Sequence, residues 1–194
     1  MLIGITGGIG SGKSTIAKQL RKMGYAVYDT DSEAKRLIVE DAAVRQQIEQ
    51  LFGKEVYADG VYQTALVAQR VFTDKSLLAQ LNAIVHPAVK ADILRWVHTI
   101  NHSTPCFVEC AILYQAGFDT LCDKVVAVTA PEDIRLARAV ARDHSTIEKV
   151  RARMRTQATE QDRLRANIII NNDGQTPIPT LCEQIIDALV GEDR

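Results

Sequence analysis

Five short apolar runs along the chain predict a core of five buried β-strands. In each run the apolar residues follow one another instead of alternating with polar residues, which is typical of parallel strands covered on both faces. The runs span Leu2–Ile5, Ala26–Tyr28, Phe107–Cys110, Val125–Val128 and Ile168–Ile170.

Segments with helical character separate these runs, as in the strand–helix–strand units of α/β proteins. The first predicted helix spans Lys13–Met23 and ends before Gly24, where a C-terminal glycine is expected. Two further helices are predicted over Glu132–Asp143 and over Thr176–Val190, which has a continuous apolar face. The alternation predicts an α/β fold around a five-stranded parallel sheet.

One long stretch does not fit a minimal parallel sheet. Between Thr30 and Ser103 the sequence has helical periodicity and no convincing strand, although an ordinary crossover needs far fewer residues. We therefore predict a mainly helical lobe inserted between the second and third strands. Within a single domain of residues 1–194, this gives a core in 1–29, 104–134 and 166–194, a helical lobe in 30–103 and a further segment in 135–165.

The amino-acid composition of the chain limits the kinds of binding partner that we expect. The 194 residues are 46% hydrophobic, which suits one globular unit with a sizeable core. The formal net charge is −1 and aromatic residues make up 5%, so we expect neither nucleic acid nor a membrane as a partner. The N-terminus lacks a signal-peptide pattern, and the four cysteines form no C-x-x-C pair. We expect free thiols, a cytoplasmic location and a monomer.

A glycine-rich stretch between the first predicted strand and helix carries the clearest chemical signal. Residues 7–14 read GGIGSGKS, a complete P-loop pattern. Glycines let backbone N–H groups approach phosphate oxygens, and the N-terminus of the following helix adds a positive dipole. Lys13 is expected to reach the β- and γ-phosphates, and the Ser14 hydroxyl to ligate Mg²⁺. The residues expected to bind ATP are Gly8, Gly10, Ser11, Gly12, Lys13, Ser14 and Thr15.

The P-loop alone leaves hydrolysis, switching and phosphoryl transfer open. A GTPase would carry an N-K-x-D motif after a late strand, whereas residues 171–173 read NND. A motor or transporter ATPase would have an apolar strand that ends in Asp, and the nearest match ends in Glu109. The remaining class is a small kinase, which excludes water, binds an acceptor and surrounds the transferring phosphoryl group with positive charge.

Two carboxylates follow the second predicted strand, at the edge where open parallel sheets bind ligands. Asp29 and Asp31 are expected to orient the acceptor hydroxyl and accept its proton, or to hold a water on Mg²⁺. The structural alternative is that Asp31 or Ser32 simply caps the next helix.

The segment 135–165 is strongly basic, with eight Arg and one Lys against four acidic residues. Arg138 and Arg142 lie four residues apart and share one face of the predicted helix. An arginine face is often merely solvated and paired with acids, but few acids are near it here. We predict that both guanidinium groups neutralise the transferring phosphoryl group, with Arg153 and Gln157 assisting when this segment closes.

Five ordered motifs resemble those of the dephospho-CoA kinase family, and the resemblance spans nearly the whole chain. It implies ATP-dependent phosphorylation of the ribose 3′-hydroxyl of dephospho-CoA, the last step of coenzyme A synthesis. It also implies a three-layer P-loop NTPase fold in which 30–103 is the acceptor lobe and 135–165 is a mobile lid. The motifs are GGIGSGKST at 7–15, D-x-D at 29–31, His86-Pro87, R-x3-R-D at 138–143 and R-x3-Q at 153–157.

The resemblance also assigns roles to single residues. Asp31 is the better candidate for the base, and Asn172, after the last strand, is expected to approach adenine. His86 is expected to organise the acceptor lobe, where Pro87 is predicted to end a helical stretch. The structural alternatives are that His86 is an ordinary structural histidine and that Asn172 belongs to a turn at Asn-Asn-Asp-Gly. The expected acceptor-binding residues are Asp29, Asp31, His86, Arg153 and Gln157.

The chain departs from the family pattern after the third strand. Glu109 keeps a carboxylate that can assist Mg²⁺ through water, but Ala111 and Gln115 stand where Pro and Glu are usual. Two other functions stay open: a nucleoside or nucleotide monophosphate kinase, and an ATP-binding regulatory module without transfer activity. Gln115 favours the regulatory module, whereas the intact Lys13, Ser14 and Asp31 oppose it.

Overall fold

The computed structural model describes residues 1–100, 103–155 and 164–191. The chain divides into two compact units, one formed by Met1–Tyr28 with Ile100–Arg194 and the other by Asp29–Thr99. Among the described residues, no helix is long and apolar enough to cross a membrane.

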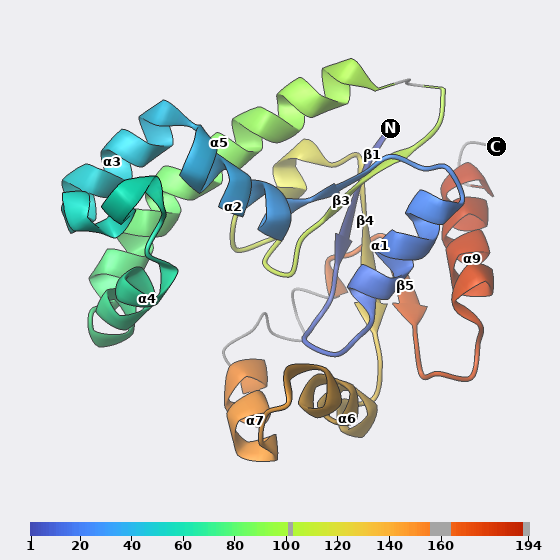
Figure 1. Cartoon of the computed structure of the whole chain (residues 1–194). Helices are drawn as coiled ribbons and strands as arrows, with labels where there is room; N and C mark the ends of the chain where they lie inside the picture. The colour runs from blue at the N-terminus through green and yellow to red at the C-terminus, as the bar shows by residue number, and fades with distance from the viewer. Residues whose placement is uncertain (101–102, 156–163, 192–194) are drawn as a thin grey trace. The chain divides into compact units, whose positions relative to one another are not determined.

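The first unit is built on a five-stranded sheet in the order β2-β3-β1-β4-β5 (Figure 1). The central strand β1 pairs in parallel with both β3 and β4, and β4 pairs in parallel with β5. This confirms the parallel sheet that the apolar runs predict. The strands are β1 (Leu2–Thr6), β2 (Val27–Asp29), β3 (Cys106–Glu109), β4 (Lys124–Thr129) and β5 (Ile168–Asn171).

Two helices, α1 (Lys13–Lys22) and α9 (Ile178–Gly191), pack against each other over one face of the sheet. Gly24 follows α1 with a φ of 91°, as the predicted helix end requires. The core beneath these helices is built mainly from apolar side chains, because side chains of the inner strands meet one face of each helix. It includes Ile3, Ile5, Phe107, Val126, Ile16, Leu20, Leu181, Ile185 and Leu189.

The opposite face of the central strand is covered by the segment after β3, which contains the short 3₁₀ helix η2 (Asp119–Leu121). A Cβ on Gly4 would come within 2.7 Å of the Leu113 side chain and 3.1 Å of the Cys122 sulfur. Glycine at this position therefore lets the segment pack directly on the sheet. Two further helices of this unit, α6 (Glu132–Asp143) and α7 (Ile147–Arg155), follow β4.

The second unit is helical, as the sequence predicts. Its longest helix is α5 (Lys75–Thr99), and α2, α3 and α4 all pack on it. Buried side chains such as Leu37, Ile48 and Ile93 form its core. The other elements are α2 (Thr30–Glu40), α3 (Ala42–Phe52), η1 (Lys54–Gly60) and α4 (Thr64–Thr73).

The expected end of a helix at Pro87 is wrong, because α5 continues through it from Lys75 to Thr99. A proline inside a helix removes one backbone hydrogen bond and crowds the preceding turn. Pro87 lies on the exposed side of α5, where water can satisfy the freed carbonyl. Val85 and Val89 are buried on either side of it, so packing holds both halves of the helix in line.

His86 makes the stability of the second unit dependent on pH. Burial lowers the pKa of its imidazole below the usual value, so between about pH 7 and pH 5 the unfolded chain binds more protons than the folded one. Acidification through that window should therefore destabilise the fold, and His86→Gln should reduce this loss. Urea unfolding at both pH values measures the effect. His98→Gln, at an exposed position of the same helix, is the control and should keep the wild-type slope; an unchanged slope in His86→Gln would contradict the argument.

Candidate functional site

The candidate site of the first unit lies where the strands of the sheet end. The glycine loop, residues 7–12, follows β1 and leads into α1. Glu109 is the last residue of β3, and Asn172 follows β5 directly. Because parallel strands end at the same edge, these groups gather at the edge that binds ligands in open α/β sheets.

Two glycines of the loop adopt the left-handed conformation that other residues avoid. Gly10 has a φ of 77° and Gly12 a φ of 93°. A Cβ on Gly10 would collide with the carbonyl oxygen of Arg135 in α6, and one on Gly12 would collide with the side-chain amide of Asn172. Glycine is therefore required both for the turn and for the close packing of the loop against its neighbours.

The N-terminus of α1 has the features of an anion site. Its N-cap is Gly12, and the described structure gives this helix neither a side-chain cap nor an acidic residue in its first turn. The first-turn amides and the positive end of the helix dipole therefore point to a site for a negative ligand. The hydroxyl of Ser11 is also buried, with no hydrogen-bond partner among the described residues. Such an orphaned donor within the loop fits a phosphate oxygen.

The first residues of α1 contact the end of β3. The Ser14 hydroxyl donates to Glu109 Oε1 at 2.5 Å, and the Lys13 ammonium lies 3.5 Å from the same oxygen. The side chains of Lys13 and Glu109 are only 16% and 8% exposed, so the carboxylate compensates a largely desolvated cation. The hydroxyl and the carboxylate are hard oxygen donors that fit Mg²⁺, which proteins commonly hold by one or two groups together with substrate phosphates.

Asn172 ties the glycine loop to two other elements. Its side-chain amide donates to the Ser11 carbonyl at 2.8 Å, in a buried position. Its backbone N–H donates to the carbonyl of Thr129 at 2.7 Å, and its own carbonyl accepts from Arg138 at 2.9 Å. The expected contact of Asn172 with adenine stays a prediction, and this amide N–H is already used inside the protein. Sequence reasoning missed the clamp because the partners are 161 residues apart.

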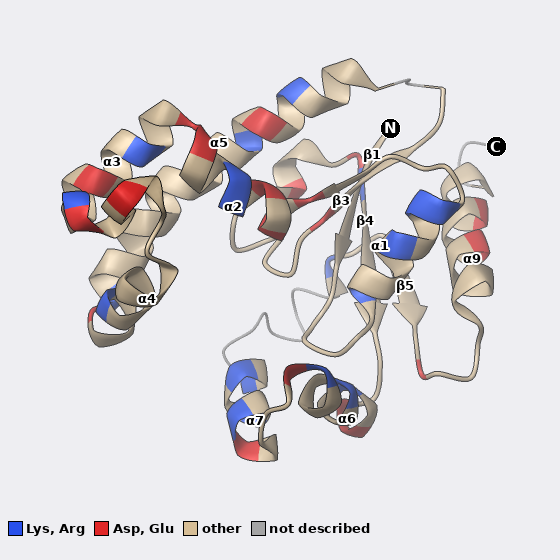
Figure 2. Cartoon of the chain, in the orientation of Figure 1, with Lys and Arg blue, Asp and Glu red and all other residues tan. Residues whose placement is uncertain are grey.

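The basic segment forms α6 and α7, where Figure 2 shows Lys and Arg concentrated on both helices. Arg142 makes two hydrogen bonds to the adjacent Asp143, at 2.7 and 3.1 Å, and Arg153 of α7 donates to the same carboxylate at 2.7 Å. Hydrogen bonds from Arg142 and then Arg153 hold the pKa of Asp143 well below its usual range. Asp143 therefore joins the two helices at their guanidinium groups.

The structure gives the two arginines of α6 different surroundings. Arg138 binds the carbonyl of Asn172, whereas Arg142 is 58% exposed and paired with Asp143. The expectation that few acids lie near the arginine face is wrong for Arg142, because its partner Asp143 directly follows it in the R-x3-R-D motif. Gln157 lies outside the described residues.

The expected acceptor residues Asp29, Asp31 and His86 belong to the second unit. The Asp29 carboxylate accepts from the backbone N–H groups of Asp31 and Ser32, at 3.1 and 3.2 Å, and so caps α2. The cap is therefore Asp29, not Asp31 or Ser32. Asp31 stands exposed in the first turn of α2 with its carboxylate outside the cap, and His86 is half-buried within α5.

The comparisons with known proteins match this chain to dephospho-CoA kinases. A family model described as dephospho-CoA kinase matches residues 1–177. A dephospho-CoA kinase of Porphyromonas gingivalis is 45% identical over 164 residues, covering 84% of this chain and 81% of the relative. One from Chlorobaculum tepidum is 37% identical over 199 residues, covering 98% and 95%.

Solved structures agree with this fold. A Thermus thermophilus structure has a TM-score of 0.83 at 33% identity, covering 99% of this chain and 97% of its own. Dephospho-CoA kinase from Campylobacter jejuni has a TM-score of 0.71 at 22% identity over 100% and 98%. Shikimate kinase from Acinetobacter baumannii, at 17% identity and a TM-score of 0.59 over 98% and 93%, shares the fold alone.

Removal of the Asn172 side-chain amide should loosen the glycine loop. We expect Asn172→Ala to cost about 1–3 kcal/mol of unfolding free energy, because the Ser11 carbonyl loses a buried partner, and to raise the KM for ATP. Thermal unfolding and steady-state kinetics measure both effects. Asn171→Ala, at the exposed neighbouring position, should stay within about 0.5 kcal/mol of wild type. Equal KM values for the two variants would contradict the expected effect of this hydrogen bond on ATP binding.

Proposed function

The chain belongs to the dephospho-CoA kinase family, and we propose how its own residues carry out the reaction of that family. The enzyme transfers the terminal phosphoryl group of ATP to the 3′-hydroxyl of dephospho-CoA, which gives coenzyme A and ADP in the last step of coenzyme A biosynthesis. The observation that carries the assignment of roles is the contact of Lys13 and Ser14 with Glu109 at the start of α1.

The glycine loop binds the triphosphate of ATP through Gly8, Gly10, Ser11, Gly12, Lys13, Ser14 and Thr15. Support comes from the N-terminus of α1 and the buried Ser11 hydroxyl, which have no side-chain cap and no hydrogen-bond partner, respectively, among the described residues. When phosphate enters, the Lys13 ammonium exchanges part of its attraction to Glu109 for the β- and γ-phosphate oxygens. That exchange places a positive charge where negative charge shifts during transfer.

Ser14 and Glu109 would hold Mg²⁺, the serine directly and the carboxylate directly or through water. When bound, the cation supplies charge neutralisation at the β- and γ-phosphates. Their 2.5 Å hydrogen bond keeps the two oxygens together at the end of β3. Glu109 thus compensates Lys13 in the free enzyme and is available as a cation ligand in the complex.

Asp31 accepts the proton of the acceptor hydroxyl as the hydroxyl oxygen forms its bond to phosphorus, while the bond to the ADP oxygen breaks. Its carboxylate is outside the helix cap and exposed in the first turn of α2. Asp29 supports Asp31 by fixing the start of that helix through two backbone hydrogen bonds. His86, which is half-buried in α5, helps to organise the same acceptor unit.

Arg142 and Arg153 bring positive charge to the transferring group, and Arg138 contributes from the side of Asn172. Planar guanidinium groups match phosphate oxygens in pairs. Arg142 and Arg153 are 58% and 53% exposed, so an anion can reach both. Gln157 is proposed to join them in binding the acceptor.

The reaction is proposed to take place in the cytoplasm on a single chain. The cysteines Cys106, Cys110, Cys122 and Cys182 are free, as expected for a reducing compartment. Every proposed role belongs to a residue of this one chain, so the proposed mechanism needs no residue from a partner subunit.

The acceptor is tested by ADP release in a coupled assay with Mg²⁺ and ATP. We expect release that depends on dephospho-CoA, with a product phosphorylated at the 3′-oxygen, and little release with nucleoside monophosphates. Preference for a nucleoside monophosphate would favour the alternative kinase. ATP binding without release in the presence of either acceptor would favour the regulatory module.

The role of Asp31 is tested by Asp31→Asn, which keeps size and removes the base. We expect kcat to fall by about 10²–10⁴-fold, the usual contribution of a general base, with ATP affinity unchanged by calorimetry. Asp59→Asn, at an exposed position in the same unit, serves as control. Near-wild-type turnover in Asp31→Asn would remove this residue from the mechanism.

The role of Arg142 is tested by Arg142→Ala, which should lower kcat/KM by about 10-fold or more because one charge-assisted contact to phosphate is lost. Lys149→Ala removes one positive charge from an exposed position of α7 and serves as the matched control. Equal kcat/KM values in these two variants would show that net charge, and not the Arg142 guanidinium, is what matters.

A further inference from the structure

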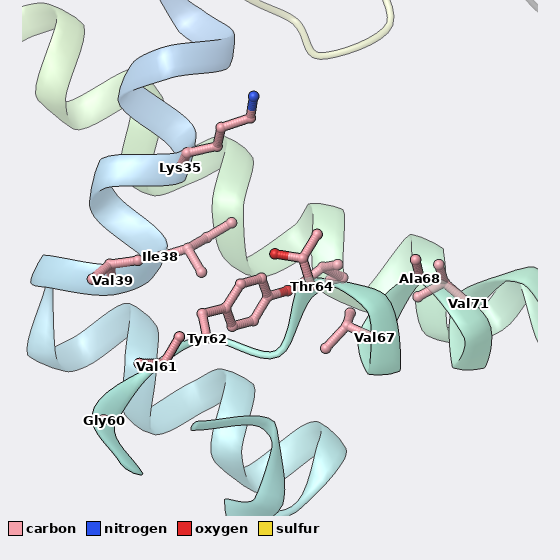
Figure 3. Close-up of a pocket in the computed structure, with 11 residues that line it drawn as sticks. Lys35, Ile38, Val39, Gly60, Val61, Tyr62, Thr64, Val67, Ala68 and Val71 are labelled. Carbon is pink, nitrogen blue, oxygen red and sulfur yellow. The ribbon is translucent and has the colours of Figure 1, made fainter. Parts of the chain in front are cut away.

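Helix α2 has two long faces that lie in different surroundings. Asp31, Lys35 and Ile38 are spaced at i, i+4 and i+7, so they share one face. Figure 3 shows Lys35 and Ile38 at an apolar cavity of about 550 Å³, which opens between α2, the loop after η1 and α4. The opposite face of α2 belongs to the packing with α5. It carries Glu33, Arg36, Leu37 and Glu40.

The guanidinium of Arg36 is the centre of this second face, and each of its three nitrogen atoms lies near a carboxylate. Nε is 2.5 Å from Glu33 Oε2 and Nη1 is 3.6 Å from Glu40 Oε2, and both acids belong to α2 itself. Nη2 donates to Asp92 Oδ2 of α5 at 2.7 Å. The guanidinium is therefore oriented by its own helix and joined to the neighbouring one.

Asp92 is held in position from its own helix. Arg95, three residues later in α5, donates to Asp92 Oδ1 at 2.9 Å. The Asp92 side chain is only 14% exposed, so solvent screens this carboxylate less than it screens a surface acid. The link between Arg36 and Asp92 is thus a charge-assisted hydrogen bond in a partly desolvated setting, where the loss of either partner is costly.

This polar link can fix the rotation of α2, which apolar packing alone does not. Leu37 is 2% exposed and belongs to the core of the unit, but the free energy of apolar burial depends little on direction. A guanidinium binds its partners along its N–H directions, so it limits how far the helix can turn about its axis. Side-chain ends lie about 5–6 Å from a helix axis, so a rotation by about 20° would move the Asp31 carboxylate by about 2 Å.

We propose that Asp92 is a positioning residue for phosphoryl transfer: through Arg36, it holds α2 at the rotation that directs the Asp31 carboxylate at the acceptor hydroxyl. This inference rests on the proposed function, because it takes the role of Asp31 from it. Asp92 acts from the face of α2 opposite to Asp31 and affects the rate only through the direction of that carboxylate. Proton transfer is sensitive to such displacements, since a misplacement of about 1 Å can cost about 10²-fold in rate.

The first test removes the charge of Asp92 and keeps its size. We expect Asp92→Asn to lower kcat by about 10-fold or more with dephospho-CoA. The KM for ATP should stay within about 2-fold, because the glycine loop belongs to the other unit. Glu40→Gln is the matched control, since it removes another carboxylate from the same guanidinium and leaves the link to α5 intact; its kcat should stay within about 2-fold of wild type. Asp92→Glu restores the carboxylate and should recover most of the turnover.

A double-mutant cycle separates positioning from a merely structural role. In the Asp31→Asn background the base is absent, so its direction no longer matters, and Asp92→Asn should change the single-turnover rate by less than about 2-fold. A general structural defect would lower the rate by the same factor in both backgrounds. Circular dichroism and Tm establish that each variant folds.

Arg36→Met keeps the test decisive if Asp92→Asn does not fold. It removes the guanidinium but keeps a long apolar stem for packing, and it leaves Asp92 paired with Arg95. We expect kcat to fall by about 10-fold or more in this variant as well, and again only where Asp31 is present.

The outcomes separate this inference from the proposed function. If the wild type does not phosphorylate dephospho-CoA, or if Asp31→Asn turns over as fast as the wild type, the proposed function or the role of Asp31 fails, and the positioning role falls with it. If the wild type is active and Asp31→Asn is slow, wild-type kcat in folded Asp92→Asn and Arg36→Met overturns the positioning role alone. An equal loss with and without Asp31 overturns it too, whereas a loss confined to the background that contains Asp31 supports it.

Discussion

The hydrogen bond from Asn172 to the Ser11 carbonyl is the interaction on which the geometry of the first unit depends. It is buried, and it joins the loop after β1 to the turn after β5. The same residue holds Arg138 of α6 and the end of β4 through its backbone. Buried polar groups are costly when unpaired, so loss of Asn172 would leave partners in three elements unsatisfied. Asn172 thus connects the glycine loop to the start of the basic segment.

The two units use their helix N-termini in opposite ways. In the described structure helix α1 has no side-chain cap, so its first-turn amides are open to an anionic ligand. Helix α2 is capped by Asp29, which satisfies two amides and leaves Asp31 outside the cap. An aspartate thus closes one helix end to anions, while a glycine keeps the other open. This contrast leaves one helix start open to an anionic ligand and the other with a carboxylate outside the cap, as the roles proposed for the two helices require.

Features that depend on a short stretch of sequence were predictable from it. The five strands, the helix of Glu132–Asp143 and the glycine loop follow from apolar runs, caps and spacing within a dozen residues. The course of α5 through Pro87 was not, because buried valines on both sides outweigh the local preference. The Asn172 clamp and the cavity of the second unit also escaped the sequence, since their partners meet only through tertiary packing. Asp143 is part of the R-x3-R-D motif, but its pairing with Arg153 depends on α6 and α7 lying side by side.

The carboxylate of Asp143 is shared by Arg142 and Arg153, so any other anion must compete with it for these two arginines. A guanidinium that already has a partner gains from a new anion only the difference between the two attractions. Chloride, with a single diffuse charge, offers little over a carboxylate that makes three hydrogen bonds, whereas a polyphosphate offers several oxygens and more charge at once. On this argument, the carboxylate of Asp143 favours its exchange for a polyphosphate over its exchange for chloride at Arg142 and Arg153.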